Sequence, residues 1–218
     1  MKLAPLVRAA TLGALLALPL APARAVDNVA NDLFPPSITM NGVFGQVIDP
    51  FWANPFWPKV FSPPDTLVNS MFVGDGANWL LNTVFWDAAV PGSGSNSIVI
   101  SLGAHYAISG LLIEADNNDF YPIDYWSGSD WITAWTPANL SGLGGMRTRA
   151  SGPLASFTTN QLRVRGIEGD NLYAVSEVMA FGTYVSSAPE PTTWALMLAG
   201  LGAMAMLARR RSRALQPE

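Results

Sequence analysis

The chain of 218 residues contains no cysteine, only one histidine and few charged side chains, which make up 13% of the sequence. The lack of cysteine excludes disulfide bonds, thiolate nucleophiles and cysteine-ligated metals. The single histidine, His105, is too little for a zinc site built on imidazoles, and no Gly-x-Ser-x-Gly nucleophile pattern accompanies it. The sequence therefore favours a protein that is not an enzyme.

Positive charge is especially scarce between the two ends of the chain. Between residues 26 and 208 only five cations stand against fifteen acids, so this stretch carries about −10. The five are Lys59, Arg147, Arg149, Arg163 and Arg165. Binding to nucleic acid needs a basic face, so no nucleic-acid partner is expected.

What the sequence does contain is apolar, and one apolar run stands near the start. Lys2 and Arg8 precede the apolar stretch 9–20, and Ala23-Arg24-Ala25 is a small-x-small cleavage site. Residues 1–25 are therefore predicted to be a signal peptide that directs the chain to Sec-type export machinery.

The other end has three parts in a fixed order. Residues 185–191 form a linker, residues 192–208 are predicted to be a transmembrane helix, and residues 209–218 a basic cytoplasmic tail. The uninterrupted apolar run 194–208 would be roughly 22 Å long as a helix, against roughly 30 Å of hydrocarbon. It is thus short for a permanent anchor, and the alternative is a soluble core helix that ends in a basic turn.

This end resembles the PEP-CTERM sorting signal of bacterial envelopes over residues 188–213. The residues that carry the resemblance are Pro189, Glu190, Pro191, Arg209, Arg210 and Arg211. The resemblance implies recognition by an exosortase-type membrane protease and removal of the tail. It also implies an intermediate tethered to the inner membrane, and a final place on the cell surface or in the extracellular matrix of a Gram-negative-type bacterium, often together with exopolysaccharide.

The body between the two ends has the pattern of an all-β protein. Short β-branched and aromatic runs alternate with Gly, Pro, Asn and Ser clusters at intervals of about ten residues, which is typical of an antiparallel sandwich or barrel. The expected strands lie at 97–103, 106–115, 121–127, 131–136, 161–169 and 174–182. Residues 26–64 are rich in proline and aromatic residues and are expected to wrap the sandwich.

Residues 65–184 also resemble the discoidin, or coagulation-factor type C, domain, an antiparallel jelly-roll β-sandwich of the galactose-binding-like class. The resemblance rests on the order and spacing of "VGDGANW", "SIVISLGAHYAISGLLIEADNNDFYPIDYW", "SGSDWITAW" and "LRVRGIEGDNLYAVSEVMAFG". It implies a binding module for carbohydrate.

Several polar and aromatic residues of the body are candidate ligand contacts. The run Asp116, Asn117, Asn118 and Asp119 offers amide and carboxylate groups to sugar hydroxyls, or only caps its own turn. Tyr121, Trp126 and Trp131 are candidate stacking surfaces for a sugar ring. Arg147 would grip an acidic group, or pair with a local acid.

The resemblance further implies a structural calcium ion, with Asp75 and Glu177 at the matching positions. Glu177 stands in the apolar stretch "SEVMAFG". If it points inward it needs a cation or hydrogen bonds, and if it points outward it is an ordinary solvated residue.

Together these features predict an exported binding module, with extracellular polysaccharide as its ligand. The alternative is a structural protein of the matrix or surface without a specific ligand.

Overall fold

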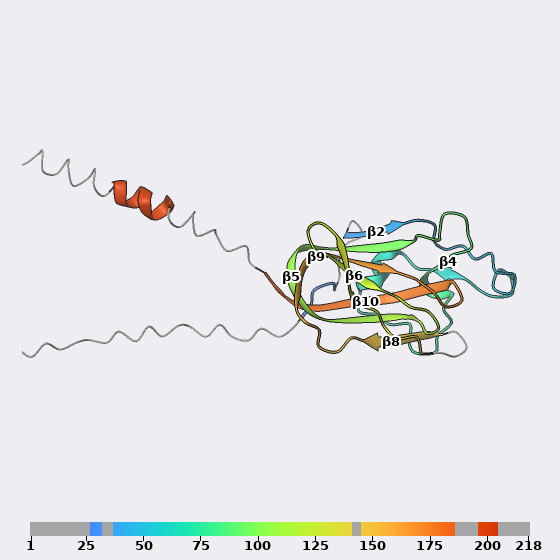
Figure 1. Cartoon of the computed structure of the whole chain (residues 1–218). Helices are drawn as coiled ribbons and strands as arrows, with labels where there is room; N and C mark the ends of the chain where they lie inside the picture. The colour runs from blue at the N-terminus through green and yellow to red at the C-terminus, as the bar shows by residue number, and fades with distance from the viewer. Residues whose placement is uncertain (1–26, 32–36, 141–144, 186–195, 205–218) are drawn as a thin grey trace, which may run out of the picture.

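The computed structural model describes residues 27–31, 37–140, 145–185 and 196–204, and within them the body is built of β-strands (Figure 1). Neighbouring strands run antiparallel, apart from one parallel pair, β3 with β4. The described elements, in chain order, are β1 (Asp27–Asn28), β2 (Ile38–Asn41), β3 (Val60–Phe61), the 3-10 helix η2 (Pro64–Val68), β4 (Leu81–Asp87), β5 (Ser97–Asp116), β6 (Ile123–Trp126), β7 (Trp131–Trp135), β8 (Met146–Ala150), β9 (Phe157–Arg165) and β10 (Leu172–Tyr184). The prediction of an all-β antiparallel sandwich is confirmed.

The long strand β5 belongs to both layers of the sandwich. Its first half pairs with β2 on one side and with β9 on the other, and β9 continues to β6 and β7. Its second half pairs with β8 and β10, and β10 continues to β4 and β3. In Figure 1 the strand curls around one end of the body to pass from one layer to the other.

The curl of β5 explains a difference from the sequence prediction, which divided this segment into two strands at Leu102-Gly103. The pairing with β9 shifts register between Ser101 and Tyr106. Gly103 lies inside this bulge at φ 73°, a conformation that glycine adopts without a steric penalty. The predicted turn is therefore a bend within one continuous strand.

The main core lies between the two layers and follows the alternation of the strands. Ile98, Ile100 and Leu102 of β5 are buried at every second position, and so are Leu162 and Val164 of β9. Because successive side chains of a strand point to opposite faces, the residues between them face outward. The alternation predicted from the sequence is thus confirmed.

Part of the N-terminal segment lies against the sandwich and part of it extends beyond the body. It supplies the edge strands β1, β2 and β3, but residues 48–57 form a loop at the end of the sandwich opposite to β1 and the end of β10 (Figure 1). Phe56 at its tip is 88% exposed. Trp52 packs on Trp79 with ring centroids 5.5 Å apart, which fixes the base of the loop to a second, smaller apolar cluster.

At the C-terminal end, residues 196–204 are helical, inside the predicted span 192–208. In the part of the chain that the structure describes, no helix has the length and apolar character needed to cross a membrane. The predicted signal peptide, the Pro-Glu-Pro triplet and the basic tail lie outside the described residues.

Candidate functional site

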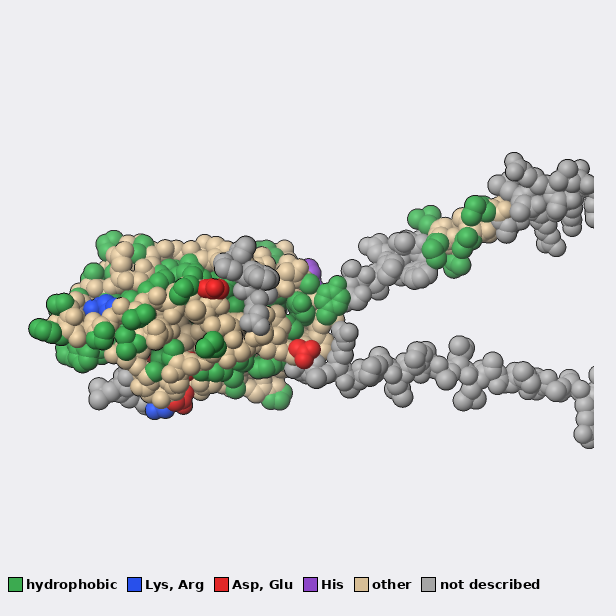
Figure 2. All heavy atoms as spheres, turned by 180° about the vertical axis from the view of Figure 1, so that it is seen from behind, with side chains coloured by type: hydrophobic (Ala, Val, Ile, Leu, Met, Phe, Trp, Pro, Cys, Tyr) green, Lys and Arg blue, Asp and Glu red, His purple; other side chains and the backbone are tan. Residues whose placement is uncertain are grey.

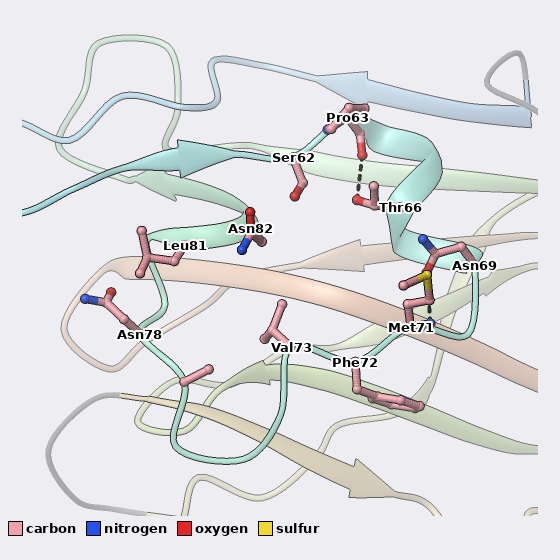
Figure 3. Close-up of a pocket in the computed structure, with 11 residues that line it drawn as sticks. Ser62, Pro63, Thr66, Asn69, Met71, Phe72, Val73, Asn78, Leu81 and Asn82 are labelled. Carbon is pink, nitrogen blue, oxygen red and sulfur yellow. Dashed lines mark hydrogen bonds between the residues drawn. The ribbon is translucent and has the colours of Figure 1, made fainter.

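A cavity of about 610 Å³ opens between η2 and the segment 69–82 (Figure 3). In Figure 3, Ser62 and Asn82 face the space from one side and Asn69 and Met71 from another, while Asn78 and Phe72 stand at its rim. The complete lining consists of Ser62, Pro63, Thr66, Asn69, Met71, Phe72, Val73, Ala77, Asn78, Leu81 and Asn82. No charged side chain is among them.

The side-chain NH₂ groups of the asparagines in the cavity are available to donate hydrogen bonds. The carbonyl oxygen of Asn69 accepts from Met71 N at 2.9 Å, and that of Asn78 accepts from Leu80 N at 2.9 Å. These bonds fix both side chains and leave their NH₂ groups without a partner among the described residues. The amide of Asn82 likewise has no described partner.

The backbone of Asn82 is also unusual, since it adopts φ 57°. Among residues other than glycine, Asn tolerates this left-handed conformation best, and such conformations are frequent at functional sites. The arrangement presents uncharged amides beside the apolar side chains of Met71, Phe72 and Val73. It suits a polar, neutral ligand with an apolar face, and it offers no pair of groups for acid–base catalysis.

The loop that borders this cavity, at Val73 and Gly74, is hydrogen-bonded to Glu114 of β5. The fully buried carboxylate of Glu114 accepts hydrogen bonds from Val73 N and Gly74 N, both at 2.8 Å. It also accepts one from Ser176 Oγ, at 2.5 Å. Three donors satisfy the oxygens of this buried side chain and fix the position of the loop.

Glu177 of β10 pairs with Glu114 across the sheet but lacks such donors. It is fully buried, and neither carboxylate oxygen has a hydrogen-bond partner among the described residues. The amides of Met71 and Ser70 lie close enough to favour its ionised form, although neither completes a hydrogen bond. Burial dominates and raises the pKa of Glu177 to about 8.

The two predicted calcium ligands therefore have different surroundings. Asp75 is half exposed, and it accepts from Thr148 N at 2.9 Å and from Arg147 at 3.3 Å, bonds that lower its pKa. Glu177 points inward, one of the two orientations considered for it. In the described part of the chain, no three acidic or histidine side chains converge in a way that could hold a metal ion.

The predicted ligand contacts at residues 116–119 are largely buried. Asp116 accepts from Asn117 N at 2.9 Å and from Gly145 N at 3.0 Å, and Asp119 accepts from Asp170 N at 3.1 Å. Asn118 donates to Asp170 Oδ2 at 2.7 Å. Burial, with Asp170 and Asp116 nearby, raises the pKa of Asp119 to about 8. In this conformation the side chains of residues 116–119 hydrogen-bond to the backbone and side chains of nearby loops. This agrees with the alternative that they cap a turn instead of binding a ligand.

The prediction of Tyr121 as a stacking surface is wrong for this conformation. Its ring is fully buried, and the Arg149 guanidinium lies 5.4 Å from its centroid. Its hydroxyl accepts from Ala174 N at 3.0 Å. Tyr121 is thus part of the core, and its ring is not accessible to a sugar.

The remaining predicted contacts are accessible. Trp126 and Trp131 are half-buried on the β6–β7 hairpin, with ring centroids 5.4 Å apart. Arg147 is exposed and pairs with Asp75, one of the two roles considered for it. None of these three lines the cavity at η2.

The sequence analysis did not single out the cavity residues. Asn69, Asn78 and Asn82 are spread over fourteen positions without a pattern, and only the path of the loop brings them together. Arg163 and Arg165, by contrast, could have been predicted to lie together. Two residues separated by one position in a strand point to the same face of the sheet.

Residues 187–212 match the PEP-CTERM protein-sorting motif, which confirms the sorting signal predicted from the sequence. A motif of this kind implies processing by an exosortase and belongs to exported proteins of the cell surface. No curated protein matches the chain.

Solved structures with a similar fold include carbohydrate-binding modules. A fucose-binding module of Streptococcus pneumoniae shares 14% identity at a TM-score of 0.45, over 72% of this chain and 95% of its own. CpGH89CBM32-5 of Clostridium perfringens, solved with GalNAc-β-1,3-galactose, shares 12% at 0.41, over 67% and 96%. SpGH29 shares 11% at 0.43 over 73% of this chain, which spans only 28% of that protein.

Proposed function

We propose that the protein is an exported, non-catalytic binding module that holds a neutral stretch of extracellular polysaccharide in the cavity at η2. The observation that carries the proposal is the cavity itself, with three asparagine amides, no charge and an exposed Phe72 at its rim. Sugar hydroxyls match the free amide donors, and the apolar face of a sugar packs on an aromatic ring.

The shape of the molecule supports a role in binding at a surface. The residue that leads into the tail, Val185, follows β10 at one end of the body, whereas the loop 48–57 lies at the other end (Figure 1). Figure 2 shows a face with few charged side chains and with hydrophobic ones scattered over it. Such a face accepts a neutral polymer without desolvating many charges.

A structural calcium ion is part of the proposal. Glu177 would hold it, since both its oxygens are buried without a hydrogen-bond partner among the described residues and calcium prefers oxygen ligands. The ion would neutralise the carboxylate and fix the loop that borders the cavity.

A glycan array tests the proposal, with the full-length protein in neutral detergent and with calcium or a chelator. We expect binding to neutral polysaccharides, reduced at least tenfold by Asn82→Gly. Glycine retains the backbone conformation at φ 57°, so this change removes only the amide. Asp65→Ala, at an exposed acid outside the cavity, is the matched control. An array without any bound glycan under either condition would contradict the proposal.

The exposed aromatic tip favours a second candidate, a structural protein that associates through loop 48–57. Assembly that grows with protein concentration, is lost on Phe56→Ser and occurs without glycan affinity would support it instead.

A further inference from the structure

A second cavity, away from η2, is lined by two arginines of the described chain. It has a volume of about 360 Å³, and its wall is formed by Gly94–Ser97 on one side and by Arg163 and Arg165 on the other. The two arginines stand at alternate positions of β9, and the residue between them, Val164, is buried in the core. The alternation of the strand therefore places both guanidinium groups on one outward face.

A single carboxylate, that of Asp124 on β6, fixes both arginines. Arg163 donates through Nε at 2.9 Å and Nη2 at 2.7 Å, and Arg165 through Nε at 2.9 Å and Nη2 at 3.2 Å. Thr133 adds a bond at 2.8 Å. Burial opposes ionisation of Asp124, but the bonds from Arg165, Thr133 and Arg163 outweigh it, and the pKa is lowered. Asp124 is thus charged, and the cluster of two cations and one anion keeps about one positive charge.

Both guanidinium groups keep free donors. The Nη1 atom of neither arginine has a hydrogen-bond partner in the described part of the chain, although each side chain is held rigidly at Nε and Nη2. A guanidinium fixed in this way loses little conformational entropy when it binds a planar anion with two oxygens. The hydroxyls of Ser95 and Ser97 supply further polar groups on the opposite wall.

The other cations of the described body have no comparable opening. Arg147 pairs with Asp75, Arg149 is buried against Asp116 O, and Lys59 donates to Asn54 O and Trp57 O. In a body of about −10, a polyanion is repelled at long range. A site with local positive charge is therefore where an acidic ligand would be accepted.

An aromatic surface adjoins the cluster. The Arg163 guanidinium lies 4.6 Å from the ring centroid of Trp131, which in turn contacts Trp126. A charged group bound at the arginines would thus have an aromatic side chain within reach of the sugar ring that carries it.

We infer that the Arg163–Arg165 cavity is a second saccharide subsite, which binds the anionic group of an acidic sugar, a uronate carboxylate or a sulfate ester. The inference rests on the proposed carbohydrate binding and extends it to acidic polysaccharides. The neutral cavity at η2 and the Arg163–Arg165 cavity would then bind different sugar units of one polysaccharide.

The test is a calorimetric titration of the full-length protein in neutral detergent with hexagalacturonate and with its methyl ester, which has the same sugar without the charge. We expect the acid to bind at least tenfold more tightly, about 1.4 kcal/mol, with the difference shrinking at high salt. A sulfated galactan oligosaccharide in a parallel titration identifies the preferred anion by its relative affinity.

Two variants place the effect at this cavity. Arg165→Gln should abolish the preference for the charged ligand. Ser95→Asp should do the same by adding a negative charge to the opposite wall, without changing any hydrogen bond of the Asp124 cluster. Ser156→Asp, which adds the same charge at an exposed serine outside this cavity, is the control and should retain most of the preference.

Equal affinity for the acid, the ester and the sulfated sugar would overturn the inference, as would an unchanged preference in both Arg165→Gln and Ser95→Asp. If neutral glycans still bind and their binding is still weakened by Asn82→Gly, the proposed function stands even when this inference fails. The failure of the inference can thus be told apart from the failure of the proposed function.

Discussion

At the scale of single residues, the most unusual feature is a pair of buried carboxyl groups that lack sufficient donors. Glu177 and Asp119 both have their pKa raised to about 8, chiefly by burial. Each keeps its proton in the folded protein at a pH at which the unfolded chain has released it. Proton binding and folding are therefore coupled.

This coupling predicts that stability without metal falls as the pH rises. The unfolded Glu177 ionises near 4.5, whereas the folded one ionises near 8, so the free energy of unfolding decreases across this window, by up to roughly 1.4 kcal/mol per pH unit. Thermal melts in chelator at pH 5 and pH 8 measure the effect. Glu177→Gln should reduce the difference, and Glu168→Gln, at an exposed acid, should not. Equal melting temperatures at both pH values would contradict this account.

Calcium should act on the same residue in the opposite direction. If the ion binds ionised Glu177 in the folded protein only, adding calcium at pH 8 raises the melting temperature, because a ligand of the native state stabilises it. The increase should vanish in Glu177→Gln. An equal increase in the variant would show that the ion binds elsewhere.

The sequence indicated part of this residue-scale picture. The family resemblance singled out Glu177, and its place in the apolar stretch "SEVMAFG" left open whether it points inward or outward. Tyr121 gave no such conflict, since a tyrosine that belongs to the core and one that stacks on a sugar have the same alternation with their neighbours. Asn82 was not predictable, because its positive φ occurs where the pairing of β4 with β3 shifts register.

At the scale of elements, the decisive feature is the bend of β5, which allows one strand to pair in both layers. The sequence predicted the strands on either side correctly, and the Leu102-Gly103 pair marked the break between them. It did not reveal that the two halves form one continuous strand, since the pairing with β9 on both sides of the break decides that.

The bend predicts a specific sensitivity at Gly103. Because this residue lies at φ 73° with open space around it, a side chain there meets no neighbour and the cost is that of the backbone alone. Gly103→Val should lower the free energy of unfolding by roughly 1–2 kcal/mol, and Gly103→Asn by clearly less, as chemical denaturation would measure. Equal costs would mean that the backbone conformation is not what limits this position.

At the scale of the whole molecule, the sorting tail and the exposed aromatic loop belong to opposite ends of the body. The tail with its PEP-CTERM motif follows β10 at one end, and the aromatic loop 48–57 lies at the other. The destination of the protein was readable from the sequence, since a sorting signal is a linear pattern. The two cavities were not, because the one at η2 depends on how the single stretch 62–82 folds back on itself, and the other joins residues 94–97 to residues 163–167.

The sorting motif predicts how the chain is trimmed. Mass spectrometry of the protein recovered outside producing cells should find a start near Val26 and no residues from the apolar tail. Replacing Pro189, Glu190 and Pro191 by alanine should leave a membrane-bound form that retains Arg209–Arg211. Release of this variant with the same mass as the wild type would contradict processing at the motif.

The central claim is that the cavity at η2 binds carbohydrate, and the most direct measurement is a crystal structure of the protein with the glycan that binds best on the array. The account predicts a sugar ring in the cavity, with hydroxyls within hydrogen-bond distance of the Asn78 and Asn82 amides and an apolar face near Phe72. A sugar bound on another surface, with this cavity filled only by water, would contradict it.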